Sequence, residues 1–207
     1  VYKNELKKYT NDDWIGFCQY RRFFLDNIYE KNHKIKTNLF SKLLVKKNDQ
    51  FGENNTIMIK PTIHKQNIYD HFINNHGEKL LKESFNILDR NNSTLFKKYL
   101  ENNEYSICNM FITKPYIFKN YCEFVFPLLE KILNYCLKEN LCVNGNMRLP
   151  VFFIERFTSY WFIKNAKVGY LSYAVLNKYF TSNLINNFYN TLKTPYSFKN
   201  FPTILNV

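Results

Sequence analysis

Short apolar runs alternate with longer stretches of helical periodicity along most of the chain. The runs at 14–20 (WIGFCQY) and 56–61 (TIMIKP) are rich in β-branched and aromatic residues, and a turn or a proline bounds them, so the pattern predicts buried strands. Further strands are predicted at 105–115 and 167–176. Strands separated by helices are typical of a layered α/β domain.

Apolar positions three and four residues apart predict helices between those strands. The expected helices cover 38–47, 66–76, 77–90, 93–103, 116–140 and 149–164. Ser93 and Thr94 are predicted to cap the fourth helix, and Pro127 is predicted to kink the longest. We expect residues 1–176 to form a single α/β domain and leave 177–207 as an unassigned C-terminal tail.

Composition describes a folded, strongly basic protein. Aromatic residues make up 18% of the 207 residues, and the formal net charge is +12. That charge favours an anionic partner. The partner could be nucleic acid, an acidic membrane surface or a small molecule that carries phosphate. Much of the lysine lies beside asparagine and isoleucine as a general bias, so charge alone is weak support for nucleic acid. No run reaches the roughly 18 apolar residues of a membrane span.

Cysteine spacing gives no support for a metal site. The five cysteines form no C-x-x-C pair and no cysteine and histidine combination with zinc spacing. Their odd number and apolar surroundings predict buried thiols in a reducing cytosol.

The first predicted strand ends on an unusual polar sequence, Gln19, Tyr20, Arg21 and Arg22. Ligands of α/β sheets gather at the carboxyl ends of strands, and guanidinium groups match diphosphate oxygens well. Only five arginines occur against 24 lysines, so an adjacent pair at a strand end is notable. The alternative is that one arginine pairs with a carboxylate such as Asp26 and the other lies on the surface.

A second polar pair lies in the middle of an aromatic helix, RLPVFFIERFTSYWF. At helical spacing, Glu155 and Arg156 share one side with Phe152 and Ser159. A buried pair of this kind is either a structural ion pair or a catalytic base with its orienting partner, because burial and a nearby cation tune a carboxylate for proton transfer.

Two further positions interrupt apolar patterns. Asn109 and Met110 interrupt the strand predicted at 105–115, and a buried asparagine needs hydrogen-bond partners from either the backbone or ligand hydroxyls. His76 precedes Gly77, where it either caps a helix or lines a pocket. His71 lies five residues before His76, a spacing that argues against a zinc pair on one helical face.

Several of these blocks occur in an order and spacing that resembles a known family. The chain is similar to a bacterial glycosyltransferase family of capsule and lipopolysaccharide loci, long catalogued as a domain of unknown function, with a His-Tyr-Arg-Arg signature. The resemblance covers about Val1 to Lys164. The blocks that carry it are WIGFCQYRRFF, TIMIKP, IYDHFINNH, SICNMFITKPYIFKNYCEFVFPLL and FFIERFTSYWF.

The resemblance implies a GT-A-like, Rossmann-like fold that transfers a sugar from a nucleotide-sugar donor to a growing surface glycan. Glu155 is the expected catalytic base that activates an acceptor hydroxyl. The donor diphosphate is expected to contact Tyr20, Arg21, Arg22 and Arg156. The remaining substrate contacts are expected from Gln19, His76, Asn109 and Met110.

Two departures from the family pattern accompany the resemblance. Gln19 stands where the family usually has histidine, and the family's N-terminal segment with its first strand has no counterpart, so a truncated or split enzyme is expected. The chain contains no Asp-x-Asp motif, and the adjacent Asp12 and Asp13 have the character of turn residues. Beyond the nucleotide-sugar donor no cofactor is identified, and the need for a divalent metal stays open.

The function expected is therefore that of a glycosyltransferase with a lipid-linked or oligosaccharide acceptor. Its expected location is the cytoplasm, with peripheral contact between the basic surface and anionic lipid at the inner face of the cytoplasmic membrane. One alternative is a catalytically inactive domain that binds glycan or a partner enzyme. Another is a basic nucleic-acid-binding protein, which the lack of a stacking motif or basic repeat disfavours.

Overall fold

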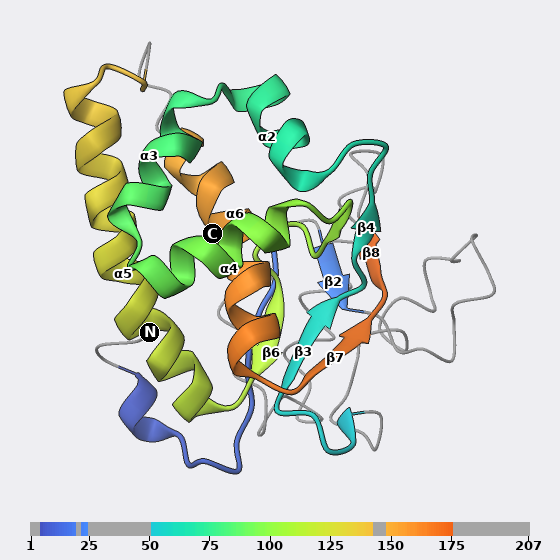
Figure 1. The fold of residues 1–207 in the computed structure, drawn as a ribbon. Helices are drawn as coiled ribbons and strands as arrows, with labels where there is room; N and C mark the ends of the chain where they lie inside the picture. The colour runs from blue at the N-terminus through green and yellow to red at the C-terminus, as the bar shows by residue number, and fades with distance from the viewer. Residues whose placement is uncertain (1–4, 20–21, 25–50, 143–147, 176–207) are drawn as a thin grey trace, which may run out of the picture.

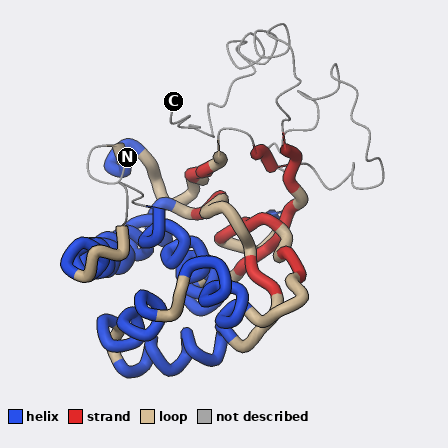
Figure 2. The backbone as a smooth tube through the Cα atoms, turned by 90° about the horizontal axis from the view of Figure 1, so that it is seen from above, coloured by secondary structure: helices blue, strands red, loops and turns tan. Residues whose placement is uncertain are grey.

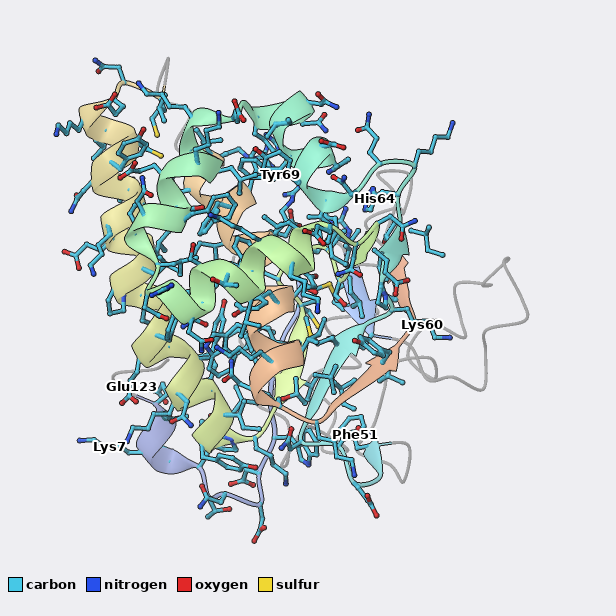
Figure 3. All side chains as sticks on the ribbon, in the orientation of Figure 1. Lys7, Phe51, Lys60, His64, Tyr69 and Glu123 are labelled. Atoms are coloured by element: carbon cyan, nitrogen blue, oxygen red, sulfur yellow. The ribbon has the colours of Figure 1, made fainter. Side chains whose placement is uncertain are left out.

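The computed structural model of the chain describes residues 5–19, 22–24, 51–142 and 148–175. A short 3₁₀ helix, η1 (Leu6–Lys8), precedes the first strand. Lysines extend from the surface at distant points of the molecule, among them Lys7 and Lys60 (Figure 3). None of the helices in these ranges is long and apolar enough to cross a bilayer.

A four-stranded sheet organises the fold. Its strand order is β1 (Ile15–Phe17), β6 (Phe111–Thr113), β3 (Thr56–Ile59) and β7 (Val168–Leu171). Strand β6 is antiparallel to β1 and to β3, whereas β3 and β7 are parallel (Figure 1). The carboxyl ends of β1, β3 and β7 therefore meet at one edge of the sheet, together with the beginning of β6.

Two small ribbons adjoin this sheet. Strand β2 (Arg22–Phe24) pairs with β8 (Tyr173–Val175), and β4 (Thr62–Ile63) pairs with β5 (Glu104–Tyr105), both antiparallel. Because β2 follows β1 after a few residues and β8 follows β7, the first ribbon lies beyond the carboxyl ends of the two outer strands.

The helices gather on one side of the strands, as Figure 2 shows. They are α2 (Ile68–His76), α3 (Lys79–Ile87), α4 (Arg90–Leu100), α5 (Pro115–Lys138) and α6 (Arg148–Asn165). Helix α5 begins with Pro115, whose fixed φ suits a first helical position, and it continues as one helix through Pro127. Helix α6 packs against α5 and α4 and presents most of its aromatic residues to the core.

Alternation along the strands divides the apolar core into two layers. Met58 and Phe111 face the helices, where they join a large cluster that includes Phe72 and Phe153. Ile57, Ile59 and Ile112 face the opposite side and join Trp14, Phe24 and Phe51. Between β3 and β6, the buried hydroxyls of Thr56 and Thr113 form a hydrogen bond of 2.7 Å, which satisfies two polar groups inside the sheet.

The layered α/β architecture predicted from the sequence is confirmed, with corrections to several elements. The strand predicted at 105–115 is broken, because a tight turn at Cys108 and Asn109 separates β5 from β6. Helix α4 begins at Arg90 and not at the predicted serine cap. Its N-cap is Asp89, whose carboxylate accepts a hydrogen bond from the Asn92 backbone N–H.

Other predicted elements are shorter, divided or outside the described residues. The strand predicted at 14–20 covers only Ile15–Phe17, and the strand predicted at 167–176 is divided into β7 and β8. The helix predicted at 38–47 and the tail at 177–207 lie outside the part of the chain that the structure describes.

Two strand glycines allow a matched test of packing in the sheet. A Cβ atom on Gly169 in β7 would lie 2.7 Å from Asn54 Nδ2 and 2.9 Å from Ile57 Cδ1, whereas a Cβ atom on Gly16 in β1 would lie 3.4 Å from its nearest neighbour, on Ile112. We expect Gly169→Ala to lower the free energy of unfolding by about 1–3 kcal/mol, because the added methyl overpacks the sheet. Gly16→Ala is the control and is expected to be close to neutral. Urea denaturation measures both, and equal effects would contradict the packing shown here.

Candidate functional site

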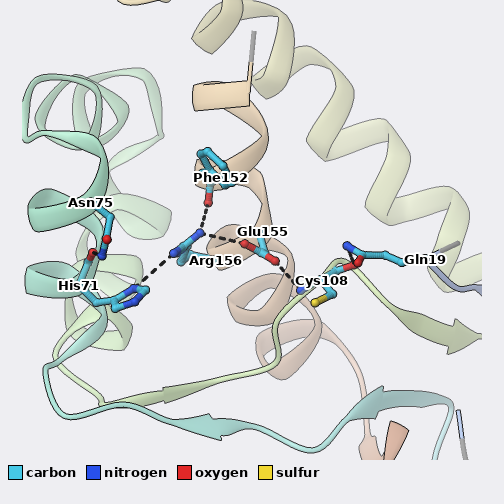
Figure 4. A network of polar contacts seen from close by, with 7 residues as sticks. All are labelled: Gln19, His71, Asn75, Cys108, Phe152, Glu155 and Arg156. Carbon is cyan, nitrogen blue, oxygen red and sulfur yellow. Dashed lines mark hydrogen bonds and ion pairs between the residues drawn. The ribbon is translucent and has the colours of Figure 1, made fainter. Parts of the chain in front are cut away.

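Polar side chains from three separate elements converge at the sheet edge where β1 ends and β6 begins. Gln19 follows β1, Cys108 and Asn109 precede β6, and Glu155 extends from the middle of α6 (Figure 4). Antiparallel pairing of Phe17 with Phe111 brings the end of β1 beside the start of β6. The topology of the sheet therefore creates this cluster from residues far apart in sequence.

The turn before β6 has an unusual backbone. Cys108 has φ of 77° and Asn109 has φ of 48°, so two consecutive residues without glycine occupy the left-handed region. Asparagine tolerates this region, but cysteine adopts it rarely. Such outliers cost on the order of 1–3 kcal/mol each and persist only where the surroundings fix them. The turn must therefore be held by its neighbours.

Side chains hold the Cys108 residue at both of its backbone polar groups. The Cys108 N–H donates to Glu155 Oε1 at 2.5 Å, and the Cys108 carbonyl accepts a hydrogen bond of 3.0 Å from Gln19 Nε2. Glu155 comes from α6 and Gln19 from the end of β1, so the turn is fixed between a helix and a strand. The backbone polar groups of this buried residue are thereby satisfied.

Arg22 extends the same network on the side of β2. Its Nη1 donates to Gln19 Oε1, and its backbone N–H donates to the Gln19 carbonyl at 3.0 Å. Among the described residues, Arg22 Nε and Asn109 Oδ1 at this edge are buried without a hydrogen-bond partner, as are His64 Nε2, Tyr99 Oη and Arg156 Nε elsewhere in the fold. Of the polar sequence predicted at the strand end, Gln19 and Arg22 therefore lie at the sheet edge, while Tyr20 and Arg21 fall outside the described residues.

The Cys108 thiol is poorly suited to act as a nucleophile. Burial raises the pKa of the Cys108 thiol to about 11, and the nearby positive charge of Arg22 lowers that pKa only in part. The Cys122 and Cys136 thiols are buried in α5, where burial raises the pKa of each to about 12. Thiol chemistry at neutral pH is therefore not expected from these three cysteines. The buried thiols predicted from the sequence are found at these three positions, whereas Cys18 and Cys142 are only half-buried.

Arg156 is buried on the helical side of Glu155. Its side chain is 4% exposed, and its Nη1 donates to Glu155 Oε2 at 2.9 Å and to the Phe152 carbonyl at 3.0 Å. Its Nη2 donates to His71 Nδ1 at 3.4 Å (Figure 4). The guanidinium carbon also lies 5.0 Å from the centre of the Tyr105 ring, within the range of a cation–π contact. Protein groups therefore bind the Arg156 guanidinium, and Glu155 connects it to the turn at the sheet edge.

Three histidines lie around the Arg156 guanidinium. The His64 and His71 ring centres are 4.5 Å apart, and His76 stacks on Phe152 with ring centres 4.2 Å apart. Figure 3 places His64 near the end of α2 that faces β4. Burial lowers the pKa of all three imidazoles, and the charge of Arg156 lowers them further. The three rings are therefore neutral at pH 7, where they add no charge to the buried cation.

The remaining predicted site residues have structural partners. His76 lies at the end of α2, but Gly77 provides the cap, because its backbone N–H donates to the Ile73 carbonyl with φ of 82°. Met110 is 1% exposed and packs in the layer opposite the helices. Within the described ranges no group of three histidine, cysteine, aspartate or glutamate side chains is arranged to hold a metal ion.

Several residues of the network were not predicted to be site residues. Cys108, His71, Tyr105 and Phe152 each contact a predicted site residue. The signal that was available for Cys108 is the asparagine that follows it, because an interrupted apolar run also indicates a turn. The contacts of His71 and Tyr105 with Arg156 depend on how α2 and β5 pack, which periodicity does not predict.

A surface depression of about 450 Å³ lies away from this network. Residues of α2, α3 and α4 line it, together with the N-cap of α2 and the C-cap of α4, and they are Asn67, Tyr69, Lys82, Phe85, Lys97 and Glu101. None of these residues belongs to the network at the sheet edge. The depression therefore gives no direct information about the chemistry of Glu155 or Arg22.

Comparison with known proteins places this geometry in context. A family model described as a domain of unknown function, DUF4422, matches residues 1–167. The solved structure titled "WbbM bifunctional glycosytransferase apo structure" is similar with a TM-score of 0.62 and 21% sequence identity, covering 85% of this chain. The chain spans only 36% of that protein's length, and the likeness concerns the fold alone. It confirms the expected GT-A-like α/β fold. No curated protein matches the chain.

The half-buried His76 imidazole predicts a loss of stability in mild acid. Burial, and then the charges of Arg156 and His71, lower the pKa of His76 from its ordinary 6.5 to about 4. Between these pH values the unfolded chain binds a proton that the folded chain does not, so the free energy of unfolding falls as the pH is lowered through this window. We expect His76→Phe, which keeps a ring against Phe152, to reduce this dependence.

Urea denaturation at several pH values between 7 and 4 measures the effect. Because the pKa values of His64 and His71 are also lowered, the free energy of unfolding of the variant should still fall to some extent as the pH is lowered. A variant whose stability depends on pH as steeply as that of the unmodified protein would show that His76 is not the group responsible.

Proposed function

The chain belongs to the DUF4422 family, and from this membership and the GT-A-like fold we propose that it is a glycosyltransferase. In this proposal it transfers a sugar from a nucleotide-sugar donor to a growing capsular or lipopolysaccharide glycan. The observation that carries the proposal is the polar network at the carboxyl ends of β1 and β3, since ligands of open α/β sheets bind outside that edge. The acceptor in this proposal is a lipid-linked or oligosaccharide glycan. The protein would reach it through peripheral contact between its basic surface and anionic lipid.

Donor binding is assigned to the arginine side of the network. Arg22 is held by Gln19, and within the described part of the chain its buried Nε–H has no hydrogen-bond partner, so those residues leave one donor of the guanidinium unused. Arg21 and Tyr20 precede it directly in sequence, and together the two arginines supply positive charge for a diphosphate. No Asp-x-Asp motif is present to hold a divalent metal beside that diphosphate.

Acceptor activation is assigned to Glu155. In direct transfer, the acceptor hydroxyl oxygen forms a bond to the anomeric carbon, the bond from that carbon to the donor phosphate oxygen breaks, and the hydroxyl proton passes to a base. The Glu155 side chain is 18% exposed, and each of its oxygens has a second lone pair beyond the bond to Cys108 or Arg156. Arg156 is proposed to orient this carboxylate, and Asn109 and His76 are proposed as further substrate contacts.

A second candidate function is favoured by the same contacts. Both oxygens of Glu155 already accept hydrogen bonds from the protein, as expected for a purely structural carboxylate. A domain that binds a nucleotide or glycan without catalysing transfer is therefore the main alternative. The two functions share donor binding and differ in turnover, so they require separate experiments.

The first experiment concerns donor binding. Arg22→Ala is expected to weaken nucleoside diphosphate binding by about 1.5–3 kcal/mol, the range for a hydrogen bond to a charged group, and Arg21→Ala is expected to act in the same direction. Calorimetry with a panel of nucleoside diphosphates measures the affinity. Arg90→Ala, at an exposed position on α4, removes the same charge and is the control. Unchanged affinity in both Arg21 and Arg22 variants would rule out the assigned donor site.

The second experiment separates catalysis from binding. Glu155→Gln keeps the shape and the acceptor for the Cys108 N–H but removes basicity and the charge that pairs with Arg156, so sugar transfer is expected to fall by about 10²–10⁴ while donor binding is retained. Rates are measured with nucleotide sugars and an oligosaccharide acceptor. If thermal stability, binding and activity all fall together, Glu155 is a structural residue and the catalytic base lies elsewhere.

A further inference from the structure

We propose that Gln19 is a positioning residue, which fixes the left-handed turn at Cys108 and Asn109 and sets the orientation of Arg22 against that turn. Its carboxamide makes two contacts with different parts of the chain. Nε2 donates to the Cys108 carbonyl at 3.0 Å, and Oε1 accepts from Arg22 Nη1. The side chain thus joins the turn before β6 to the first residue of β2.

The chemistry of glutamine suits this place. A carboxamide offers a donor and an acceptor on one planar group, whereas a carboxylate offers only acceptors and a lysine only donors. The Cys108 carbonyl requires a donor, and the Arg22 guanidinium requires an acceptor. Gln19 satisfies both requirements without introducing a charge at a half-buried position.

The contact from Gln19 matters because the backbone of the turn at Cys108 and Asn109 is strained. Cys108 and Asn109 both have positive φ, and the described contacts that fix the turn are the bonds of Cys108 to Glu155 and to Gln19. Loss of the Gln19 bond releases the carbonyl side of the turn, where Asn109 begins. The direction of the Asn109 side chain therefore depends on Gln19.

Two buried polar atoms belong to the residues next to this contact. Asn109 Oδ1 is an acceptor and Arg22 Nε is a donor, and neither has a hydrogen-bond partner among the described residues. An acceptor matches a sugar hydroxyl, and a guanidinium donor matches a phosphate oxygen. This step rests on the proposed function. In it, Gln19 sets the distance and direction between Asn109, which contacts a sugar hydroxyl of the donor, and Arg22, which contacts a donor phosphate.

Labelling of the Cys108 thiol tests the positioning role without any ligand. The thiol is 5% exposed and its pKa is raised to about 11 by burial, so a thiol reagent should modify it slowly at neutral pH. Peptide mass spectrometry separates its rate from those of Cys122 and Cys136. Those two thiols are buried in α5 and report on global unfolding.

Two variants of position 19 form a matched pair. Gln19→Met keeps the length and removes both hydrogen bonds, while Gln19→Glu keeps the acceptor for Arg22, removes the donor to Cys108 and adds a negative charge. We expect both variants to label Cys108 about three- to tenfold faster, in the range for one lost hydrogen bond between neutral groups, with Cys122 and Cys136 unchanged. Unchanged Cys108 labelling, or equal acceleration of all three thiols, would overturn the proposal.

A binding cycle distinguishes positioning from direct contact with ligand. If Gln19 acts through Asn109, then Gln19→Met and Asn109→Ala should each weaken binding of uridine diphosphate, and the double variant should bind no more weakly than the weaker single variant. Additive losses would overturn this indirect role. If the unmodified protein binds no nucleoside diphosphate, the donor site of the proposed function fails, while faster labelling of Cys108 still supports the role of Gln19 in the turn.

Discussion

The hydrogen-bonding groups of a single residue, Cys108, connect the main parts of this fold. Its N–H is held by Glu155 from α6 and its carbonyl by Gln19 from the end of β1, while its side chain packs in the core layer opposite the helices. The left-handed turn that these contacts fix is the point where the chain leaves β5 and enters the central sheet at β6. Helix position, strand pairing and the polar edge of the sheet are therefore linked through one short turn.

Burial of Arg156 explains the aromatic and histidine residues around it. An unpaired guanidinium inside a protein is strongly unfavourable, so it requires a carboxylate, carbonyl acceptors or ring faces. Glu155 and the Phe152 carbonyl supply the first two, and Tyr105 supplies a ring. Neutral imidazoles complete the surroundings, because a protonated histidine there would repel the cation. The carboxylate that holds Cys108 is thus itself held by a buried charge, and the contacts run without a break from His71 in α2 to Gln19 after β1.

Much of the fold follows from periodicity, but the network at the sheet edge depends on long-range contacts. Alternating strands and helices were predictable because the spacing of apolar residues is local. By contrast, the bond from Gln19 to Cys108 joins residues 89 positions apart, and no pattern within either segment indicates it. The start of α4 was misplaced because Asp89 and Ser93 are both good N-caps, and only the structure shows which side chain accepts the helix N–H. A positive φ at cysteine also has no signature in the apolar pattern.

The strained turn also bears on whether this edge of the sheet serves binding or only stability. A chain under pressure for stability alone gains nothing from two left-handed residues without glycine, nor from a buried Asn109 oxygen and a buried Arg22 nitrogen that lack partners among the described residues. Strained backbone clusters where a ligand is recognised. Here the left-handed turn lies at the carboxyl ends of the strands, where α/β folds bind their ligands. The strain therefore favours a binding edge over a merely structural one.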